Sequence, residues 1–373
     1  MSSKILRILP LMALGGLLSG CKLTVLDPAG DVAAQQSELI AYSTYLMLII
    51  IVPVIALTLF FAWRYRASNT SAKYDPEWSH STGLEVVIWT APLVIIIALG
   101  ALTWVSTHLL DPYRPIARID ANRPVPADAK PLEVDVVALD WKWLFILPEQ
   151  GIATVNELAA PVDVPIKFRI TASSVMNTLS IPALAGMVYA MPGMVTQLHA
   201  VINKPGEYAG LSANYSGAGF SNMTFKFHGM SQADFDRWVA QAKSSNGGNL
   251  GRAEYTALAR PSIKEPVRRY ASIDPQLFGA IADMCVEEGQ MCASEMMRLD
   301  AQGGTGMAGT LNVVTRTMRR GGVARAEGVG QDVELPVVLA FCTPTRPTGL
   351  PTEISDAEPA LAAAASSSSG TAE

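Results

Sequence analysis

Two long uncharged stretches dominate the first third of the chain, at residues 39–63 and 86–110. Neither stretch contains an aspartate, glutamate, lysine or arginine, and each is about 25 residues long. A helix of that length can cross the hydrocarbon core of a bilayer with some tilt. Pro53 and Pro92 lie inside the stretches, and membrane helices tolerate proline where neighbouring groups satisfy the freed carbonyl. The pattern therefore predicts a two-helix transmembrane hairpin with a loop at residues 64–85.

The pattern changes after a linker at residues 111–130, which is rich in proline and charge. Short β-like runs follow, separated by turns such as Pro192-Gly193 and Pro205-Gly206. The strand-like runs cover residues 132–139, 165–171, 194–202 and 223–228. Short strands at close spacing, with no helical period, are typical of a β-sandwich. We therefore expect an all-β sandwich over residues 131–230.

Helical spacing returns at residue 231. Ser231 and Asp234 form a capping-box pattern, and apolar residues then recur at helical spacing as far as Ala242. Weaker helix candidates cover residues 252–259 and 276–284. These signals predict a short helical region over residues 231–300.

The last part of the chain, residues 301–373, is rich in glycine, alanine, threonine and serine. A segment of this composition lacks the apolar surface that a packed core requires. We expect a low-complexity, mostly disordered tail with a short ordered stretch near residues 333–342.

The N-terminus has the features of a bacterial export signal. Lys4 and Arg7 precede an apolar run at residues 8–18 that is too short to span a bilayer. Leu18-Ser19-Gly20-Cys21 follows, and small residues before a cysteine are typical of a lipoprotein cleavage site. The pattern predicts a signal peptide at residues 1–20 and an acylated Cys21. The alternative is an ordinary signal peptide followed by a chance cysteine.

A lipid on Cys21 would also fix the orientation of the hairpin, which the lysines and arginines around it set only weakly. Residues 21–38 would be periplasmic, the loop at 64–85 cytoplasmic, and everything after about residue 111 periplasmic. We therefore expect a multi-pass lipoprotein of the bacterial inner membrane with its large C-terminal domain in the periplasm.

Composition agrees with a membrane protein and excludes several other classes. Hydrophobic residues make up 50% of the 373 residues and charged residues only 16%. The net charge is −5 without a basic block, so nothing indicates a nucleic-acid partner. Four cysteines are too few for a disulfide scaffold, and no pair among the four histidines has the spacing of a zinc or haem site.

A lipoprotein cysteine, a two-span hairpin and a periplasmic β-domain, in this order, resemble subunit II of the haem–copper respiratory oxidases. The local motifs are closer still to the cytochrome bo-type ubiquinol oxidase branch. The likeness covers roughly residues 15–290, and its motifs are specific as a set although each is weak alone. The motifs are Leu26-Asp27-Pro28, Phe61-Ala62-Trp63-Arg64-Tyr65-Arg66-Ala67-Ser68-Asn69, Trp78-Ser79-His80-Ser81, Asp140-Trp141-Lys142-Trp143, Pro148-Glu149-Gln150-Gly151-Ile152-Ala153-Thr154-Val155-Asn156-Glu157, Ser174-Val175-Met176-Asn177, Tyr189-Ala190-Met191 and Tyr215-Ser216-Gly217.

The resemblance implies a cupredoxin-like sandwich that has lost its copper. In relatives that oxidise cytochrome c, a dinuclear copper centre is held by an upstream histidine and by Cys-x-Glu-x-Cys-x3-His-x2-Met, and these soft ligands suit copper electron transfer. At those positions this chain has Asn177, Ser212, Asn214, Ser216, Phe220 and Met223. Serine does not ionise near neutral pH and cannot bridge copper as a thiolate does. We therefore expect no metal or other cofactor in this chain, and Met223 in the core.

Further site residues follow from the same resemblance. Glu85, at the cytoplasmic start of the second span, matches a glutamate at the mouth of a proton pathway into subunit I; the alternative is a carboxylate that simply favours a helix N-terminus. Trp141 and Trp143 match the aromatic region through which electrons enter copper-bearing relatives, and here we expect them to pack at the subunit interface. Tyr215 and Phe220 are expected in the core.

The remaining cysteines and the partners complete the expectations. In an oxidising periplasm Cys285 and Cys292 are expected to form a disulfide, which leaves Cys342 as the odd one out. The resemblance implies that haems, one copper and the ubiquinol site belong to subunit I. The expected partners are subunit I, the small membrane subunits III and IV, membrane lipid and, through subunit I, ubiquinol.

The chain is therefore expected to be the non-haem subunit II of a proton-pumping ubiquinol oxidase, holding subunit I and contributing the Glu85 proton inlet. The alternatives are a cytochrome c oxidase subunit II, an orphan membrane-tethered cupredoxin-like lipoprotein, and a purely structural assembly subunit. The missing cysteines argue against the first, and a simple tethered binder would not need the hairpin with Glu85.

Overall fold

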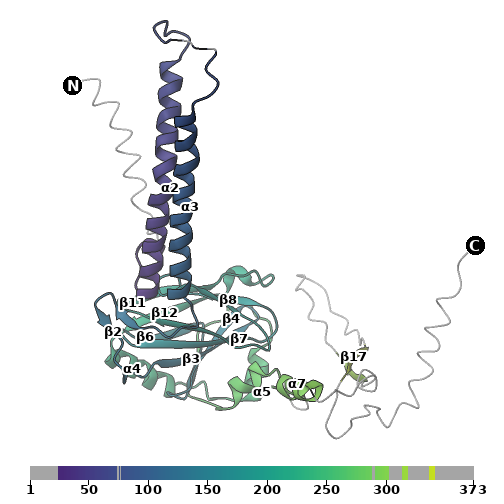
Figure 1. The fold of residues 1–373 in the computed structure, drawn as a ribbon. Helices are drawn as coiled ribbons and strands as arrows, with labels where there is room; N and C mark the ends of the chain where they lie inside the picture. Colours follow the sequence, from purple (N-terminus) through teal and green to yellow (C-terminus); the bar gives the residue numbers. More distant parts are fainter. Residues whose placement is uncertain are drawn as a thin grey trace, which may run out of the picture. The chain divides into compact units, whose positions relative to one another are not determined.

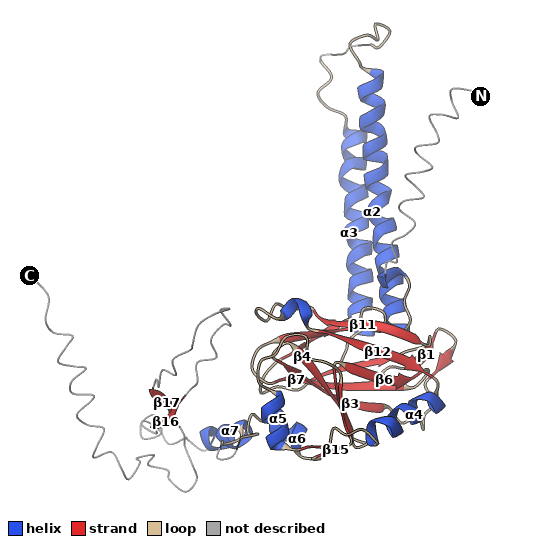
Figure 2. Cartoon of the chain, turned by 180° about the vertical axis from the view of Figure 1, so that it is seen from behind, coloured by secondary structure: helices blue, strands red, loops and turns tan. Residues whose placement is uncertain are grey.

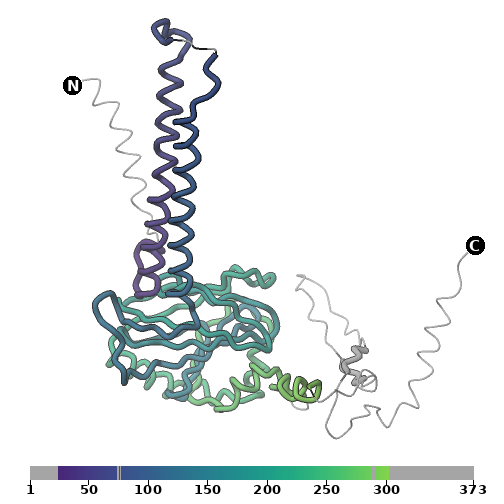
Figure 3. The backbone as a smooth tube through the Cα atoms, in the orientation of Figure 1, coloured from purple at the N-terminus to yellow at the C-terminus, as the bar shows by residue number. Residues whose placement is uncertain are grey.

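The computed structural model describes residues 24–73, 75, 77–287 and 290–301, together with the backbone of 313–317 and 336–340. Cys21, Cys342, the segment predicted as a signal peptide and most of the tail lie outside these residues. The chain forms two compact units, residues Met1–Phe278 and Gly279–Glu373, and Figure 3 follows the backbone through both.

The first unit begins with two long helices that run side by side in Figure 1, α2 (Asp31–Arg64) and α3 (Thr82–Leu109). A short 3-10 turn, η1 (Thr24–Leu26), precedes them. Both helices are long and apolar enough to cross a membrane, and none of their most apolar windows is buried within the chain. The predicted hairpin is confirmed, but α2 starts at Asp31 rather than at residue 39, because its first two turns are polar and lie outside the uncharged stretch.

The helices lead into a β-sandwich. Its six-stranded sheet has the order β10-β7-β3-β4-β5-β14, and its five-stranded sheet has the order β6-β12-β11-β8-β9. The pairs β3–β7 and β6–β12 are parallel and the other neighbours are antiparallel. The strands are β3 (Leu132–Leu139), β4 (Lys142–Leu147), β5 (Ile152–Val155), β6 (Glu157–Pro161), β7 (Pro165–Ala172), β8 (Asn177–Ser180), β9 (Met187–Ala190), β10 (Thr196–Val201), β11 (Gly206–Ser212), β12 (Thr224–Met230) and β14 (Arg268–Tyr270).

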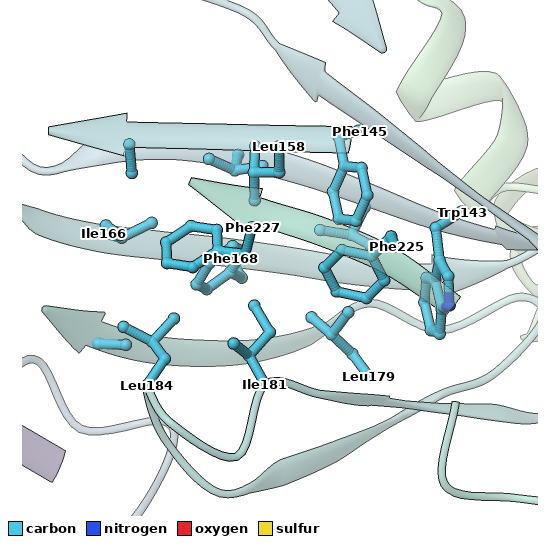
Figure 4. Close-up of a cluster of buried hydrophobic side chains, with 14 of the residues drawn as sticks. Trp143, Phe145, Leu158, Ile166, Phe168, Leu179, Ile181, Leu184, Phe225 and Phe227 are labelled. Carbon is cyan, nitrogen blue, oxygen red and sulfur yellow. The ribbon is translucent and has the colours of Figure 1, made fainter. Parts of the chain in front are cut away.

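The core lies between the two sheets. Ile166 and Phe168 of β7 point inward toward Phe225 and Phe227 of β12 (Figure 4), and alternate residues of β3, such as Val134, belong to the same core. Four β-like runs of the sequence correspond to β3, β7, β10 and β12, and the bounds of β3 agree with the prediction. The sandwich predicted for residues 131–230 is therefore confirmed as a fold.

The segment after β12 packs against the sandwich, where α4 and α5 are seen in Figure 2. Helix α4 packs against β6 of the five-stranded sheet and against β5 and β14 of the six-stranded sheet. Arg269 makes two hydrogen bonds to Glu157, of 2.8 and 3.0 Å. The Arg169 guanidinium lies 5.0 Å from the ring centroid of Phe278. β4 is buried at every position and β3 at every position but one. The elements are α4 (Gln232–Lys243), β13 (Asn249–Leu250), α5 (Arg252–Leu258), β15 (Ser272–Ile273) and α6 (Leu277–Ala282).

The cap predicted at Ser231 is present, since the Ser231 hydroxyl accepts a hydrogen bond from the Asp234 backbone amide at 3.2 Å. The linker prediction needs one correction. Residues 111–130 contain an antiparallel pair, β1 (Arg118–Asp120) and β2 (Arg123–Pro124). Its turn is closed by the Asp120 carboxylate, which accepts from the backbone amides of Asn122 and Arg123, and the proline content obscured this pairing.

The second unit contains α7 (Ala293–Ala301) and a hairpin of β16 (Val313–Thr317) with β17 (Pro336–Ala340). β17 lies within the stretch 333–342, where the sequence predicts local order. Cys285 and Cys292 are joined by a disulfide bond, the pair named from the sequence.

Candidate functional site

The positions that the resemblance assigns to copper lie at one end of the five-stranded sheet. Asn177 opens β8 and Ser212 closes β11, and these strands are neighbours. Asn214 and Ser216 lie in the loop that follows, and η2 (Phe220–Asn222) leads to Met223. The structure brings Asn177 and Ser212 into contact, with the Ser212 hydroxyl donating to Asn177 Oδ1 at 3.2 Å. Both residues are buried, with exposed fractions of 1% and 4%.

Hydrogen bonds hold this loop where a metal would hold it in a copper protein. The Asn177 amide donates to the Val175 carbonyl at 3.1 Å, and the Asn214 amide donates to the Met176 carbonyl at 3.1 Å. The backbone amide of Ser212 donates to the Met223 carbonyl at 3.1 Å. These hydrogen bonds use the polar side chains of Asn177 and Asn214 and fix the conformation of the loop with protein groups alone.

This donor set does not fit a copper centre. It offers neutral hydroxyl and amide groups, with no thiolate and no imidazole at the matching positions. The Met223 side chain is 1% exposed and belongs to the hydrophobic core, as the sequence predicts. Ser216 Oγ is buried without a hydrogen-bond partner, but one neutral hydroxyl cannot replace two bridging sulfurs.

One other group of ligand-type atoms occurs in the described part of the chain, in the second unit. Asp283, Cys285 and Cys292 place one ligand atom each within 4.8 Å of one another. Both sulfurs are consumed in the disulfide, so neither is a thiolate. The Asp283 carboxylate accepts hydrogen bonds from the Ser294 amide and hydroxyl, at 2.7 and 2.5 Å, at the start of α7. The group is therefore a helix cap beside a disulfide.

Trp141 lies against the loop that contains Ser216 and Gly219. It adopts a left-handed backbone conformation, with φ of 64°, between β3 and β4. Its indole Nε1 donates to the Ser216 carbonyl at 3.0 Å. A Cβ at Gly219 would lie 2.3 Å from the indole ring, so only glycine admits this contact.

Three aromatic expectations need correction. Trp143 is fully buried and its ring centroid lies 5.8 Å from that of Phe225, so it packs inside the sandwich and not at a subunit interface. Tyr215 is 75% exposed, because its loop turns outward before η2, and is not a core residue. Phe220 is half-buried, with its ring 5.6 Å from the Tyr215 ring, and lies outside the core cluster.

Glu85 lies in the first turn of α3, on the loop side of the hairpin. Its carboxylate oxygen is 2.7 Å from His80 Nδ1, and His80 Nε2 is 3.1 Å from the Thr82 hydroxyl. Both side chains of the pair are about half exposed or more, at 62% and 51%. A carboxylate and an imidazole in contact at a water-facing helix start can exchange protons with each other and with solvent. The sequence singled out Glu85 but not His80.

Two buried charged groups were also missed, because nothing in the sequence marks a charge as buried. The Lys142 ammonium donates to the Arg260 carbonyl at 2.8 Å and to the Ser262 hydroxyl at 2.5 Å, and burial lowers its pKa. The Asp135 carboxylate accepts two hydrogen bonds from Arg169, at 2.5 and 2.7 Å. Burial raises the pKa of Asp135 in spite of that partner, whereas the hydrogen bond raises the pKa of Arg169.

Two family models match this chain. Residues 128–229 match the family described as "Cytochrome C oxidase subunit II, periplasmic domain", and residues 243–289 match "COX Aromatic Rich Motif".

Curated relatives are similar over most of their length. "Cytochrome bo(3) ubiquinol oxidase subunit 2" of Pseudomonas putida is 52% identical over 75% of this chain and 86% of its own. "Ubiquinol oxidase subunit 2" of Acetobacter aceti is 52% identical over 71% of this chain and 83% of its own. "Quinol oxidase subunit 2" of Bacillus cereus is 38% identical over 70% of this chain and 87% of its own.

Among solved structures, the periplasmic domain of subunit II of cytochrome oxidase of Bradyrhizobium japonicum is 21% identical. It covers 30% of this chain and 93% of its own, with a TM-score of 0.29.

Proposed function

The chain belongs to the ubiquinol oxidase subunit 2 family, and from this premise we propose that it is the non-haem subunit II of a proton-pumping ubiquinol oxidase in an aerobic respiratory chain. The complex would transfer electrons from ubiquinol to oxygen. The observation that carries the proposal is the Ser212–Asn177 hydrogen bond, which occupies the place of copper ligands in the cytochrome c-oxidising relatives.

The proposed subunit binds no cofactor of its own. Ubiquinol is lipophilic and reaches a membrane subunit directly, so electrons do not need a relay through a periplasmic domain. Haems, one copper and the ubiquinol site would belong to subunit I, with the small subunits III and IV completing the complex. The neutral, hydrogen-bonded groups at the former copper positions support this assignment.

The proposed location is the bacterial inner membrane, with a signal peptide at residues 1–20 and an acyl chain on Cys21. In this arrangement residues 64–85 form the cytoplasmic loop, and the sandwich at 131–230, the segment 231–300 and the tail lie in the periplasm. The uncharged runs of α2 and α3 support two spans. Their side chains are exposed in the isolated chain, up to 78% at Trp89. This surface supports a role in stabilising subunit I, because it must face lipid or another apolar partner.

The proposed contribution to proton movement is an inlet at Glu85. A carboxylate at a helix end near the interface can collect a proton from water and pass it toward a neighbouring subunit. His80 Nδ1 lies 2.7 Å from one Glu85 oxygen. His80 is therefore proposed as a positioning residue that keeps the carboxylate at the loop surface.

Metal analysis of the purified complex tests the assignment. The complex is purified through a tag on this chain, and its haem and copper contents are measured relative to protein. We expect haem to copurify, with a single copper that belongs to subunit I. Additional copper that is retained after a chelator wash would contradict the copper-free assignment, and a preparation without haem would contradict the oxidase assignment.

A further inference from the structure

A cavity of about 360 Å³ lies where the start of α2, the end of α3 and the sandwich meet. Its polar lining comes from Asp31, Gln36, Asp111, Arg114, Arg118 and His199. Apolar side chains, including Val32, Leu109 and Leu198, complete the walls. A cavity of this size falls in the range of small-ligand sites.

The walls of the cavity are fixed by specific contacts. Asp31 is 7% exposed, and its carboxylate accepts from Arg118 Nε at 2.9 Å and from Gln35 Nε2 at 2.7 Å. His199 Nδ1 lies 3.1 Å from the Pro112 carbonyl, which can only accept, so that nitrogen carries the proton. These contacts hold the residues after α3 against β10, so specific interactions define the shape of the cavity.

The depth of the cavity corresponds to the headgroup layer of a bilayer. Gln36 lies four residues before Ile40 on α2, a rise of about 6 Å, and Ile40 belongs to the uncharged run. Leu109, the last residue of α3, also lines the cavity. The polar layer on each side of a hydrocarbon core is roughly 5–7 Å thick, so the cavity spans the level at which both apolar runs end.

The charges in the cavity balance, but only half of them are paired. Two carboxylates and two guanidinium groups line it. Asp31 and Arg118 form an ion pair. Asp111 and Arg114 have no ion-pair partner among the described residues, and both line the cavity from the exposed segment after α3, where one Asp111 oxygen accepts from the Tyr113 backbone amide at 2.9 Å. Arg114 instead donates to the His108 carbonyl at 3.3 Å, at the C-terminal end of α3.

We propose that this cavity binds the zwitterionic headgroup of a phospholipid of the phosphatidylethanolamine type, with the phosphate on Arg114 and Arg118 and the ammonium on Asp111. The inference rests on the proposed two-span anchoring, which places the cavity at the outer face of the membrane. The balance of charge favours a zwitterion over an anionic lipid, because a purely anionic headgroup would leave Asp111 facing like charge. The apolar walls suit the glycerol and upper acyl carbons.

Hydrogen exchange of the complete oxidase complex tests the proposal locally. The complex is placed in nanodiscs of phosphatidylglycerol alone or of phosphatidylglycerol mixed with phosphatidylethanolamine, and backbone exchange is followed in peptides that cover residues 109–118. We expect phosphatidylethanolamine to slow exchange there by roughly fivefold, as when a bound headgroup adds one hydrogen bond to the segment. The double variant Asp111→Asn with Arg114→Gln should lose this protection.

The matched control is Arg237→Gln, which removes one exposed guanidinium from α4, far from the cavity lining. It should keep the full response to phosphatidylethanolamine. Equal exchange in both lipid mixtures would overturn the proposal, whether that exchange is fast or slow. Slow exchange in both would mean that a protein partner covers the cavity. Release of the chain from membranes by alkaline carbonate would overturn the anchoring itself, so the two failures are distinguishable.

Discussion

The hydroxyl of Ser212 and the amide oxygen of Asn177 lie 3.2 Å apart, buried between neighbouring strands of the five-stranded sheet. In a copper-bearing relative a thiolate and an imidazole would face a metal at these two positions. Here one side chain donates to the other, and the nearby carbonyls of Val175 and Met176 accept from Asn177 and Asn214. Hydrogen bonds between these side chains therefore add to the backbone pairing that joins β8 and β11.

Restoring the ligands should restore the metal, because the strands and Met223 are already in place. We expect a variant of the complex to acquire a dinuclear copper centre with thiolate-to-copper absorption, measured by metal analysis and visible spectroscopy. The substitutions are Asn177→His, Ser212→Cys, Asn214→Glu, Ser216→Cys and Phe220→His. The control keeps both serines and carries only the other three changes. Copper uptake by that control would contradict the argument that thiolates are required.

Glu85→Gln keeps the shape of the side chain and removes its ability to carry a proton. We expect the oxygen-consumption rate of the complex to fall by roughly tenfold or more, since a positioned acid–base group contributes at least that much. His80→Gln should lower the rate by a smaller factor, because Glu85 remains but loses its 2.7 Å partner. Glu77→Gln, an exposed glutamate in the same loop, is the control and should leave the rate unchanged. Equal oxygen-consumption rates for Glu85→Gln and the control would contradict the proposal that Glu85 is a proton inlet.

Lys142→Met tests the buried ammonium. The variant leaves the Arg260 carbonyl and the Ser262 hydroxyl without their donor, so we expect unfolding free energy to fall by about 1–3 kcal/mol at neutral pH. Burial lowers the pKa of Lys142 below its ordinary value, so the folded state binds fewer protons than the unfolded state between the two pKa values. The wild type should therefore gain stability relative to the variant as pH rises through that window. Denaturant unfolding at several pH values measures the difference, and a gap that narrows with rising pH would contradict it.

Gly30→Ala tests the joint between α2 and the sandwich. A Cβ at Gly30 would lie 2.4 Å from the Val201 carbonyl oxygen and 2.7 Å from that of Leu184. Both contacts are with backbone, so the start of α2 must shift, and we expect a loss of about 1–3 kcal/mol. Gly279→Ala, in α6, meets no atom within 4 Å and is the control. The thermal unfolding midpoints of the two variant complexes are compared. Equal midpoints would show that a Cβ at Gly30 fits beside the Val201 and Leu184 backbone without a shift of α2.

Much of the fold can be predicted because several elements carry a recognisable pattern within their own sequence. The uncharged runs predict α2 and α3, the Ser231 hydroxyl predicts the start of α4, and alternation predicts β3. The strands that the sequence does not reveal lack such a pattern. β6 reads Glu-Leu-Ala-Ala-Pro and is buried at every position, because α4 packs against this edge strand and Arg269 bonds to Glu157, so it lacks the alternation of a half-exposed strand.

The candidate site could be predicted less well from the residues alone. Only the resemblance points to Asn177 and Ser212, since an asparagine and a serine 35 residues apart carry no signal until β8 and β11 pair. Trp141 and Trp143 were interpreted alike from one motif. The strand geometry separates them, because Trp143 points into the core and Trp141 sits at a left-handed turn over Gly219.

Oxygen uptake by the intact purified complex tests the central claim most directly, with reduced ubiquinol and reduced cytochrome c supplied in turn as electron donors. The account predicts uptake with ubiquinol alone, because the periplasmic domain offers no copper relay to a soluble donor. Uptake driven by cytochrome c would contradict it.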